Sequence, residues 1–219
     1  GEFIGNGKYS DITVFSFHPV KIITTAEGGM ALTNDAALAE RMALMRSHGI
    51  TRDPAQMTHA ADGPWYYQQI ELGLNYRLTD LQAALGLSQL DRLDALVARR
   101  HALAQRYDQL LAPLPLTVPW QHPDTHSALH LYVIRLDLDA VALSHREVFE
   151  GLRSRGIGVN LHYIPVHLQP YYRNLGSRPG DCPHAEQYYA EAISLPMFAA
   201  LGETQQDEVV GALQEVLLP

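Results

Sequence analysis

The chain has 219 residues, of which 47% are hydrophobic and 18% are charged, and its formal net charge is −8. This composition is typical of a globular protein with a hydrophobic core, and the negative charge provides no basic surface for nucleic acid or anionic lipid. We therefore expect no nucleic-acid partner, and no membrane partner either, since no apolar run is long enough to span a bilayer. The single cysteine, Cys182, cannot form an internal disulfide and favours a reducing, cytoplasmic location.

The first part of the chain predicts two strands and a helix. Residues 11–17 alternate and are rich in β-branched and aromatic side chains, which predicts a strand, and residues 29–33 predict a second, short one. Asn34 is expected to cap a helix that ends near Ser47. Residues 48–75 have little periodicity and predict a long, ordered loop of the kind that is usually functional.

One long helix is expected over residues 79–111. Thr79 and Gln82 have the spacing of a capping box, and apolar residues follow at intervals of mostly three, four or seven. Two prolines then end the helix. We place a domain boundary there, with residues 1–115 in one domain and residues 116–219 in a smaller α/β domain.

The second domain is expected to contain strands, helices and one irregular segment. Capping boxes, apolar periodicity and proline positions indicate its elements. The expected strands span residues 129–138, 157–163 and 193–196, the expected helices span residues 144–155, 186–192 and 204–217, and the irregular segment spans residues 165–183.

Lys21 is the first candidate for chemistry. A lysine becomes a nucleophile when its surroundings favour the neutral amine, or when it is already held as an imine. Lys21 lies between an apolar strand and the Gly28–Gly29 pair, where desolvation and a close approach to the backbone are expected. Ser16 lies at the strand end and could offer its hydroxyl to a phosphate. The alternative is a loop lysine whose amine reaches solvent.

Asn75 and Arg77 form the second candidate, because they immediately precede a predicted helix N-terminus. Such a position has free N–H groups and the positive end of the helix dipole, which suits an anion. The alternative is an ordinary turn followed by a capping threonine.

The segment "NLHYIPVHLQPYY" over residues 160–172 is the third candidate. His162, Tyr163 and His167 could form a polar, stacking wall for a substrate. A metal site built from the two histidines is a second interpretation, but their spacing matches no common zinc motif. A third interpretation is that both histidines are half-buried and satisfied by hydrogen bonds.

Four segments together resemble a known family. "SDITVFSFHPVKIITTAEGGMALTND", "RSHGI", "GLNYRLTD…QAALGLSQL" and "HYIPVHLQPYY" are similar, in this order, to the pyridoxal 5'-phosphate (PLP)-dependent sugar-nucleotide aminotransferases of the DegT/DnrJ/StrS type. The resemblance covers essentially the whole chain. It implies the α/β fold-type I architecture of aspartate aminotransferase-like enzymes, with residues 1–115 as the C-terminal part of the large PLP-binding domain and residues 116–219 as the small domain.

The resemblance also implies roles for the candidate residues. Lys21 corresponds to the lysine that holds PLP covalently and then acts as general base and acid, and Ser16 corresponds to a ligand of the PLP phosphate. Asn75 corresponds to a residue that reaches the PLP phosphate of the neighbouring subunit, which implies a homodimer with shared active sites. His162, Tyr163 and His167 correspond to a region that approaches the sugar nucleotide, and we expect these three residues to bind the substrate.

Within the family, the chain is most similar to members that transfer an amino group, usually from L-glutamate, to C4 of a 4-keto-6-deoxy UDP-N-acetyl sugar in pseudaminic acid biosynthesis. Family members carry a long segment before "SDITVF", which supplies the remainder of the PLP pocket. We therefore expect the 219-residue chain alone to be inactive or very poor. Many relatives have glycine where this chain has Ala26, and a positive φ there would cost alanine about 1 kcal/mol.

Two rival functions remain open. A non-catalytic member of the same fold could act as a regulator or scaffold, but such a chain has no need of Lys21. A metal hydrolase could use some of the 11 histidines. It predicts a stoichiometric metal and no PLP chromophore.

Overall fold

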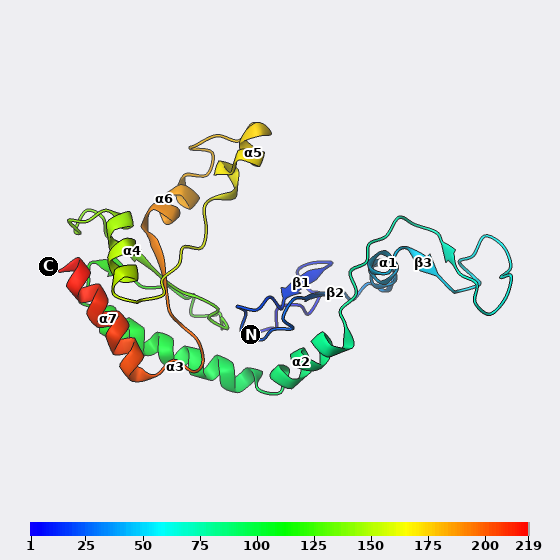
Figure 1. The fold of residues 1–219 in the computed structure, drawn as a ribbon, viewed down its shortest axis with the longest axis horizontal. Helices are drawn as coiled ribbons and strands as arrows, with labels where there is room; N and C mark the ends of the chain where they lie inside the picture. Colours follow the sequence, from blue (N-terminus) through cyan, green and yellow to red (C-terminus); the bar gives the residue numbers. More distant parts are fainter. Residues whose placement is uncertain (219) are drawn as a thin grey trace. The chain divides into compact units, whose positions relative to one another are not determined.

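The computed structural model describes residues 1–218 and divides the chain into two compact units, Gly1–Leu93 and the residues from Asp94 onward. Each unit mixes helices and strands (Figure 1). The division falls at the start of α3 (Leu93–Leu111), earlier than the domain boundary expected after residue 115. It falls there because α3 packs its buried face into the hydrophobic core of the second unit.

The strands of the first unit form two short antiparallel pairs. β1 (Thr13–Ser16) pairs with β2 (Gly29–Leu32), which confirms the two strands predicted there. β3 (Ile50–Thr51) pairs with β4 (Gln68–Gln69). Residues 48–75 are therefore partly strand-paired, and a plain loop was the wrong prediction, because two-residue strands leave no periodic signal in a sequence.

The first helix is α1 (Ala36–Arg46). Its N-cap is Asp35, whose carboxylate accepts hydrogen bonds from the N–H groups of the first helical turn. The prediction that Asn34 caps this helix is wrong by one residue. The Asn34 amide instead donates to the carbonyl of Asn6 at 2.8 Å.

The single long helix predicted over residues 79–111 is wrong, because the structure has α2 (Asp80–Leu90) and then α3. α2 begins with the predicted capping box at Thr79. It ends in a tight turn, in which the N–H of Arg92 donates to the carbonyl of Gln89 at 3.0 Å. No proline or glycine marks this turn, so the interruption has no local sequence signal, although it lies where the two compact units meet in the chain.

The second unit contains a three-stranded antiparallel sheet in the order β5 (Leu116–Thr117), β6 (Tyr132–Leu136) and β7 (Ala192–Leu195). The strand predicted over residues 157–163 is wrong, since only Asn160 forms an isolated bridge, to Ser194 of β7. The backbone after Asn160 leaves β7, and its next contact with Ser194 is made by a side chain.

Four further helices and a 3₁₀ turn complete the second unit. α4 begins with the predicted capping box between Ser144 and Glu147. The 3₁₀ turn and α5 lie in the segment predicted to be irregular. Among the helices in residues 1–218, none is both long and apolar enough to cross a bilayer. The bounds are α4 (His145–Ser154), the 3₁₀ turn (Val166–Leu168), α5 (Pro170–Asn174), α6 (Pro183–Glu191) and α7 (Glu203–Leu217).

α7 lies along α3 in the second unit (Figure 1). The Gln206 amide donates to the carbonyl of Leu103 at 3.0 Å, and Arg106 pairs with Asp207 at 2.7 Å. Apolar side chains from these two helices, α4 and the sheet form one core. This contiguous core explains why the second unit is compact by itself.

The first unit differs sharply in burial. Within residues 1–218, every fully buried hydrophobic side chain lies in the second unit. Val14 on β1 is 73% exposed, Leu72 is 85% exposed and Leu81 on α2 is 86% exposed. A two-stranded sheet with exposed apolar side chains is marginally stable alone.

Candidate active site

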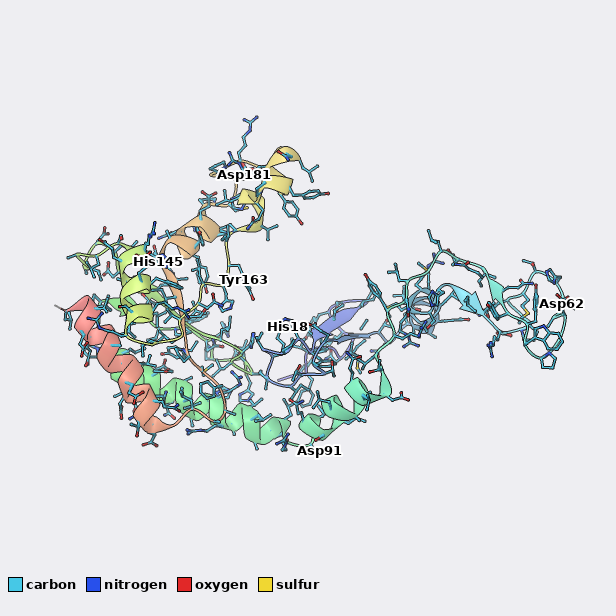
Figure 2. All side chains as sticks on the ribbon, in the orientation of Figure 1. His18, Asp62, Asp91, His145, Tyr163 and Asp181 are labelled. Atoms are coloured by element: carbon cyan, nitrogen blue, oxygen red, sulfur yellow. The ribbon has the colours of Figure 1, made fainter. Side chains whose placement is uncertain are left out.

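Lys21 lies in the loop of residues 17–28 that joins β1 to β2. His18, labelled in Figure 2, lies at the start of this loop. The loop is closed at its base, where the N–H of Thr25 donates to the carbonyl of Phe17 at 3.0 Å. The N–H of Lys21 donates to the carbonyl of His18 at 2.9 Å, which forms a turn. Lys21 therefore has a defined backbone position without belonging to a helix or strand.

Ser16 and Lys21 share this loop. Ser16 ends β1, opposite Gly29, and its exposed hydroxyl accepts a 3.4 Å hydrogen bond from the N–H of His18. The Lys21 side chain is partly buried, and within residues 1–218 its amine has no ion pair or hydrogen bond. A lysine amine without a partner and a serine hydroxyl on the same loop are the groups that could hold a cofactor covalently at one end and by a phosphate at the other.

The second half of the loop has unusual backbone geometry. Gly28 has φ +153°, and a β-carbon there would lie 2.3 Å from Oγ1 of Thr25. A β-carbon on Gly29 would lie 2.7 Å from the carbonyl oxygen of Phe15. Both glycines therefore allow the loop to pack closely against its own chain, and the close approach of a cofactor to their backbone stays a prediction. Ala26 has φ +64°, so this position does adopt the left-handed conformation, which is costly for alanine.

The chain around Asn75 pairs with the end of α1. The N–H of Leu74 donates to Met45 O at 2.7 Å, and the N–H of His48 donates to Leu74 O at 2.8 Å. Asn75 itself bridges to Ser47. The "SHG" and "GLNY" motifs are therefore two sides of one contact. The Asn75 side chain is exposed, and no hydrogen bond within residues 1–218 joins it to the Lys21 loop.

His162 and Tyr163 belong to the second unit. Nδ1 of His162 lies 2.7 Å from Oγ of Ser194, which is buried on β7. The Tyr163 ring meets the His162 ring edge-on, with centroids 4.7 Å apart, and is 69% exposed (Figure 2). Hydrogen bonding fixes the imidazole, while the phenol faces solvent.

His167 lies in the 3₁₀ turn, and its Nε2 donates to the Glu186 carboxylate at 2.7 Å. This hydrogen bond lowers the pKa of the Glu186 carboxyl. His162 and His167 are thus both partly buried and hydrogen bonded, as one of the three interpretations expected, and a role at a substrate stays a prediction. In the part of the chain that the structure describes, no three His, Cys, Asp or Glu side chains are grouped to hold a metal ion.

The Lys21 loop is held by a contact between Thr24 and Gln89, two residues that the sequence analysis did not single out. The backbone of Thr24 exchanges two hydrogen bonds with the side chain of Gln89 on α2. The two residues are 65 positions apart, so no local pattern connects them. Gln89 does lie in the motif "QAALGLSQL", whose polar positions in an otherwise apolar helix are the available signal.

The family of the chain follows from its sequence. Residues 3–214 match the DegT/DnrJ/EryC1/StrS aminotransferase family, and the chain belongs to this family. The spore coat polysaccharide biosynthesis protein SpsC of Bacillus subtilis is 36% identical over 214 residues, which cover 96% of this chain and 55% of SpsC.

Solved structures of this family are similar to the chain. The Helicobacter pylori PseC, an aminotransferase involved in the biosynthesis of pseudoaminic acid, has a TM-score of 0.85 and 32% identity, covering 99% of this chain and 56% of PseC. The PMP-form of the putative sugar aminotransferase Spr1654 from Streptococcus pneumoniae has a TM-score of 0.85 and 31% identity, covering 96% and 54%. These matches confirm the expected α/β fold class. The chain spans about half the length of the relatives it matches.

Proposed function

We propose that the chain is part of a PLP-dependent aminotransferase that transfers an amino group from L-glutamate to C4 of a 4-keto-6-deoxy UDP-N-acetyl sugar. The observation that carries this proposal is Lys21, a partly buried residue in the loop after β1, whose amine has no ion pair within residues 1–218. In a chain that belongs to an aminotransferase family, such a lysine is the natural attachment point for PLP. We place this enzyme in the cytoplasm.

Two residues of this segment would bind different parts of PLP. Lys21 Nζ would hold PLP covalently, and the Ser16 hydroxyl would bind its phosphate. When bound there, PLP supplies an electron sink for bond breaking at the carbon that carries the amino group. Once the amino group of the donor has displaced Lys21 from PLP, the freed Lys21 amine would act as a general base toward the proton on that carbon and as a general acid that delivers the proton to the cofactor.

Asn75 would bind the PLP phosphate of a second copy, so that a homodimer shares its active sites. Two observations support this. The Asn75 side chain is exposed and has no hydrogen bond to the Lys21 loop among the described residues. The first unit also exposes large apolar side chains that a further protein surface would cover.

The finer proposal concerns the sugar. We assign the sugar nucleotide to the surface of His162, Tyr163 and His167, where the exposed Tyr163 ring is available for stacking. The activity would be that of a UDP-4-amino-4,6-dideoxy-N-acetyl-β-L-altrosamine transaminase in pseudaminic acid biosynthesis. The similarity to Helicobacter pylori PseC supports this choice, and the similarity to SpsC supports polysaccharide biosynthesis more broadly.

Borohydride labelling tests the central claim. Residues 1–219 contain two lysines, Lys8 and Lys21, so Lys8→Arg is the matched control for Lys21→Arg. The protein expressed from its whole reading frame is mixed with PLP, reduced and mapped by mass spectrometry. We expect loss of the visible absorption band and a label on Lys21, which Lys21→Arg abolishes and Lys8→Arg leaves intact. A label that persists in Lys21→Arg protein would overturn the assignment.

A product assay tests the substrate. The same protein with L-glutamate and 4-keto-6-deoxy UDP-N-acetyl sugars is expected to form the 4-amino sugar. The 219-residue chain alone is expected to be inactive or very poor, since it spans about half the length of the relatives it matches. Turnover of the short chain at ordinary enzymatic rates would contradict this expectation.

A further inference from the structure

The motif "QAALGLSQL" on α2 has a role that the family assignment leaves unexplained. In Gln89, the carboxamide faces the backbone of Thr24 and makes two hydrogen bonds. The Thr24 N–H donates to Oε1 at 3.2 Å, and Nε2 donates to the Thr24 carbonyl at 2.8 Å. One side chain therefore satisfies both backbone groups of a loop residue, as a neighbouring strand would.

Thr24 passes this restraint to the rest of the loop. Its hydroxyl donates to the carbonyl of Phe17 at 2.8 Å and accepts the N–H of Ala26 at 3.0 Å. Thr25 closes the loop on the same Phe17 carbonyl. Lys21 lies between these anchors and has one backbone hydrogen bond of its own, to His18. The position of the Lys21 backbone is therefore set by Thr24 on one side and by His18 on the other.

One face of α2 is built for this contact. Gln82, Gly86 and Gln89 are four and three residues apart, so they share a face of the helix. Gln82 donates to the carbonyl of Glu27 at 3.1 Å. A β-carbon on Gly86 would lie 2.8 Å from Cγ2 of Thr25, which is buried. This face holds the loop by polar contacts and a glycine, where an ordinary amphipathic helix would present apolar side chains.

We propose that Gln89 is a positioning residue, which fixes Thr24 and thereby holds Lys21 where its amine meets the cofactor. This inference rests on the proposed role of Lys21. A reacting group has to be held within roughly 0.5 Å of its productive position, and loops hold such positions less well than helices do. Residues 18–24 have no helix or strand, so a side chain from a regular helix supplies the missing restraint.

Gln89→Glu is the sharpest variant. A carboxylate accepts the Thr24 N–H, but it has no donor for the Thr24 carbonyl and repels it. When the new carboxyl group is protonated, it regains one donor and one acceptor and can restore both hydrogen bonds. Gln89→Met removes both bonds without adding charge. Gln109→Glu is the matched control, because Gln109 is exposed on α3 in the other compact unit.

Hydrogen exchange of the full-length protein without PLP tests the clamp independently of the chemistry. Residues 18–25 are expected to exchange about tenfold faster or more in Gln89→Glu and Gln89→Met than in wild type, with Gln109→Glu unchanged. In Gln89→Glu, this excess is expected to fall as the pH approaches the carboxyl pKa. Wild type at each pH corrects for His18, Lys21 and Glu27 in the loop and for Asp80 in α2.

Labelling with added PLP tests the positioning role. In both Gln89 variants, the PLP concentration that half-saturates borohydride labelling of Lys21 is expected to rise about tenfold, and the pH midpoint of the visible band is expected to shift. Unchanged exchange in residues 18–25 would overturn the clamp, and faster exchange with unchanged labelling and midpoint would overturn the positioning role. If wild type is not labelled at Lys21, the proposed function fails, whereas exchange still decides the clamp. Gln89→Met provides the test if Gln89→Glu does not fold.

Discussion

His167 and Glu186 join two segments of the second unit that are 19 residues apart in the chain, with Nε2 of the imidazole 2.7 Å from Oε1 of the carboxylate. The same oxygen accepts the N–H of Gly180 at 2.7 Å. The His167 side chain is 12% exposed and that of Glu186 is 26% exposed. The pair therefore closes the segment around Asp181, labelled in Figure 2, onto the 3₁₀ turn. His167 has a structural contact that is independent of any substrate.

This contact predicts a loss of order in acid. The hydrogen bond from His167 and then that from Gly180 lower the pKa of Glu186 below its ordinary value of 4.5. When folding lowers the pKa of a carboxyl group, that group stabilises the folded state fully at a pH above its ordinary, unfolded-state pKa. The stabilisation is lost as the pH falls through the lowered, folded-state pKa. Hydrogen exchange of residues 176–182 is therefore expected to accelerate in that acid range.

Glu186→Gln is the control for this prediction. Its amide oxygen can still accept from His167 and Gly180, but it does not titrate. In Glu186→Gln, exchange should therefore not accelerate in acid. In Glu186→Ala, which loses the acceptor, exchange should be faster at every pH. An acid response in Glu186→Gln that equals the wild-type response would show that another group is responsible.

Arg100 is expected to be a major stabilising residue of the second unit. It is buried on α3, and its Nη1 donates to the carbonyls of Leu129, His130 and Met197 at 3.1, 3.1 and 3.2 Å. Burial lowers the pKa of the guanidinium. Arg100→Met keeps the aliphatic stem and removes the donors, so we expect a loss of about 2–4 kcal/mol in the free energy of unfolding.

Urea denaturation measures this loss, and Arg153→Met is the matched control. Arg153 is exposed in the last turn of α4, so its replacement should change stability by no more than about 0.5 kcal/mol. Equal effects of the two variants would show that the three carbonyl contacts of Arg100 contribute nothing measurable.

Local sequence patterns predicted the features that depend on a few neighbouring residues. The capping boxes at Thr79 and Ser144 are visible within four residues, and both form. The position of Lys21 in a loop after a strand could be predicted for the same reason. The strand predicted over residues 157–163 is absent because strand formation needs a partner, and only Asn160 meets β7.

Contacts between distant residues could not be predicted in this way. The clamp of Gln89 on Thr24 depends on how α2 lies against the Lys21 loop, and the sequence around neither residue indicates this contact. The end of α2 could not be predicted either, because neither proline nor glycine stands between Leu90 and Leu93. The overall composition predicted a hydrophobic core, but it could not indicate that, within residues 1–218, every fully buried hydrophobic side chain lies in the second unit.

Gly73 is expected to control the placement of Asn75. A β-carbon on Gly73 would lie 2.2 Å from the backbone nitrogen of Gly49 and 2.5 Å from the carbonyl carbon of His48. Backbone atoms cannot rotate away, so Gly73→Ala should displace the chain around Asn75 and cost about 1–3 kcal/mol. Faster exchange of the amide of Leu74, which donates to α1, would report the displacement directly.

Gly158→Ala is the matched control for Gly73→Ala. No atom lies within 4 Å of a β-carbon at Gly158, so this variant should change stability by no more than about 0.5 kcal/mol. Unchanged exchange at Leu74 in Gly73→Ala would mean that the added methyl group is accommodated without displacing this segment from α1, and the predicted coupling to Asn75 would be wrong.

Ala26 gives a prediction of opposite sign to the usual effect of glycine. Its φ of +64° lies in the left-handed region, which costs a residue with a β-carbon about 1–2 kcal/mol. Ala26→Gly removes this cost but adds about 0.5–1 kcal/mol of unfolded-state entropy, so the net change should range from neutral to stabilising.

Ala39→Gly is the matched control, because Ala39 is exposed inside α1, where glycine should destabilise by about 0.5–1 kcal/mol. Urea midpoints of the two variants should therefore move apart. If Ala26→Gly destabilises the protein as much as Ala39→Gly does, the left-handed turn at Ala26 carries no strain.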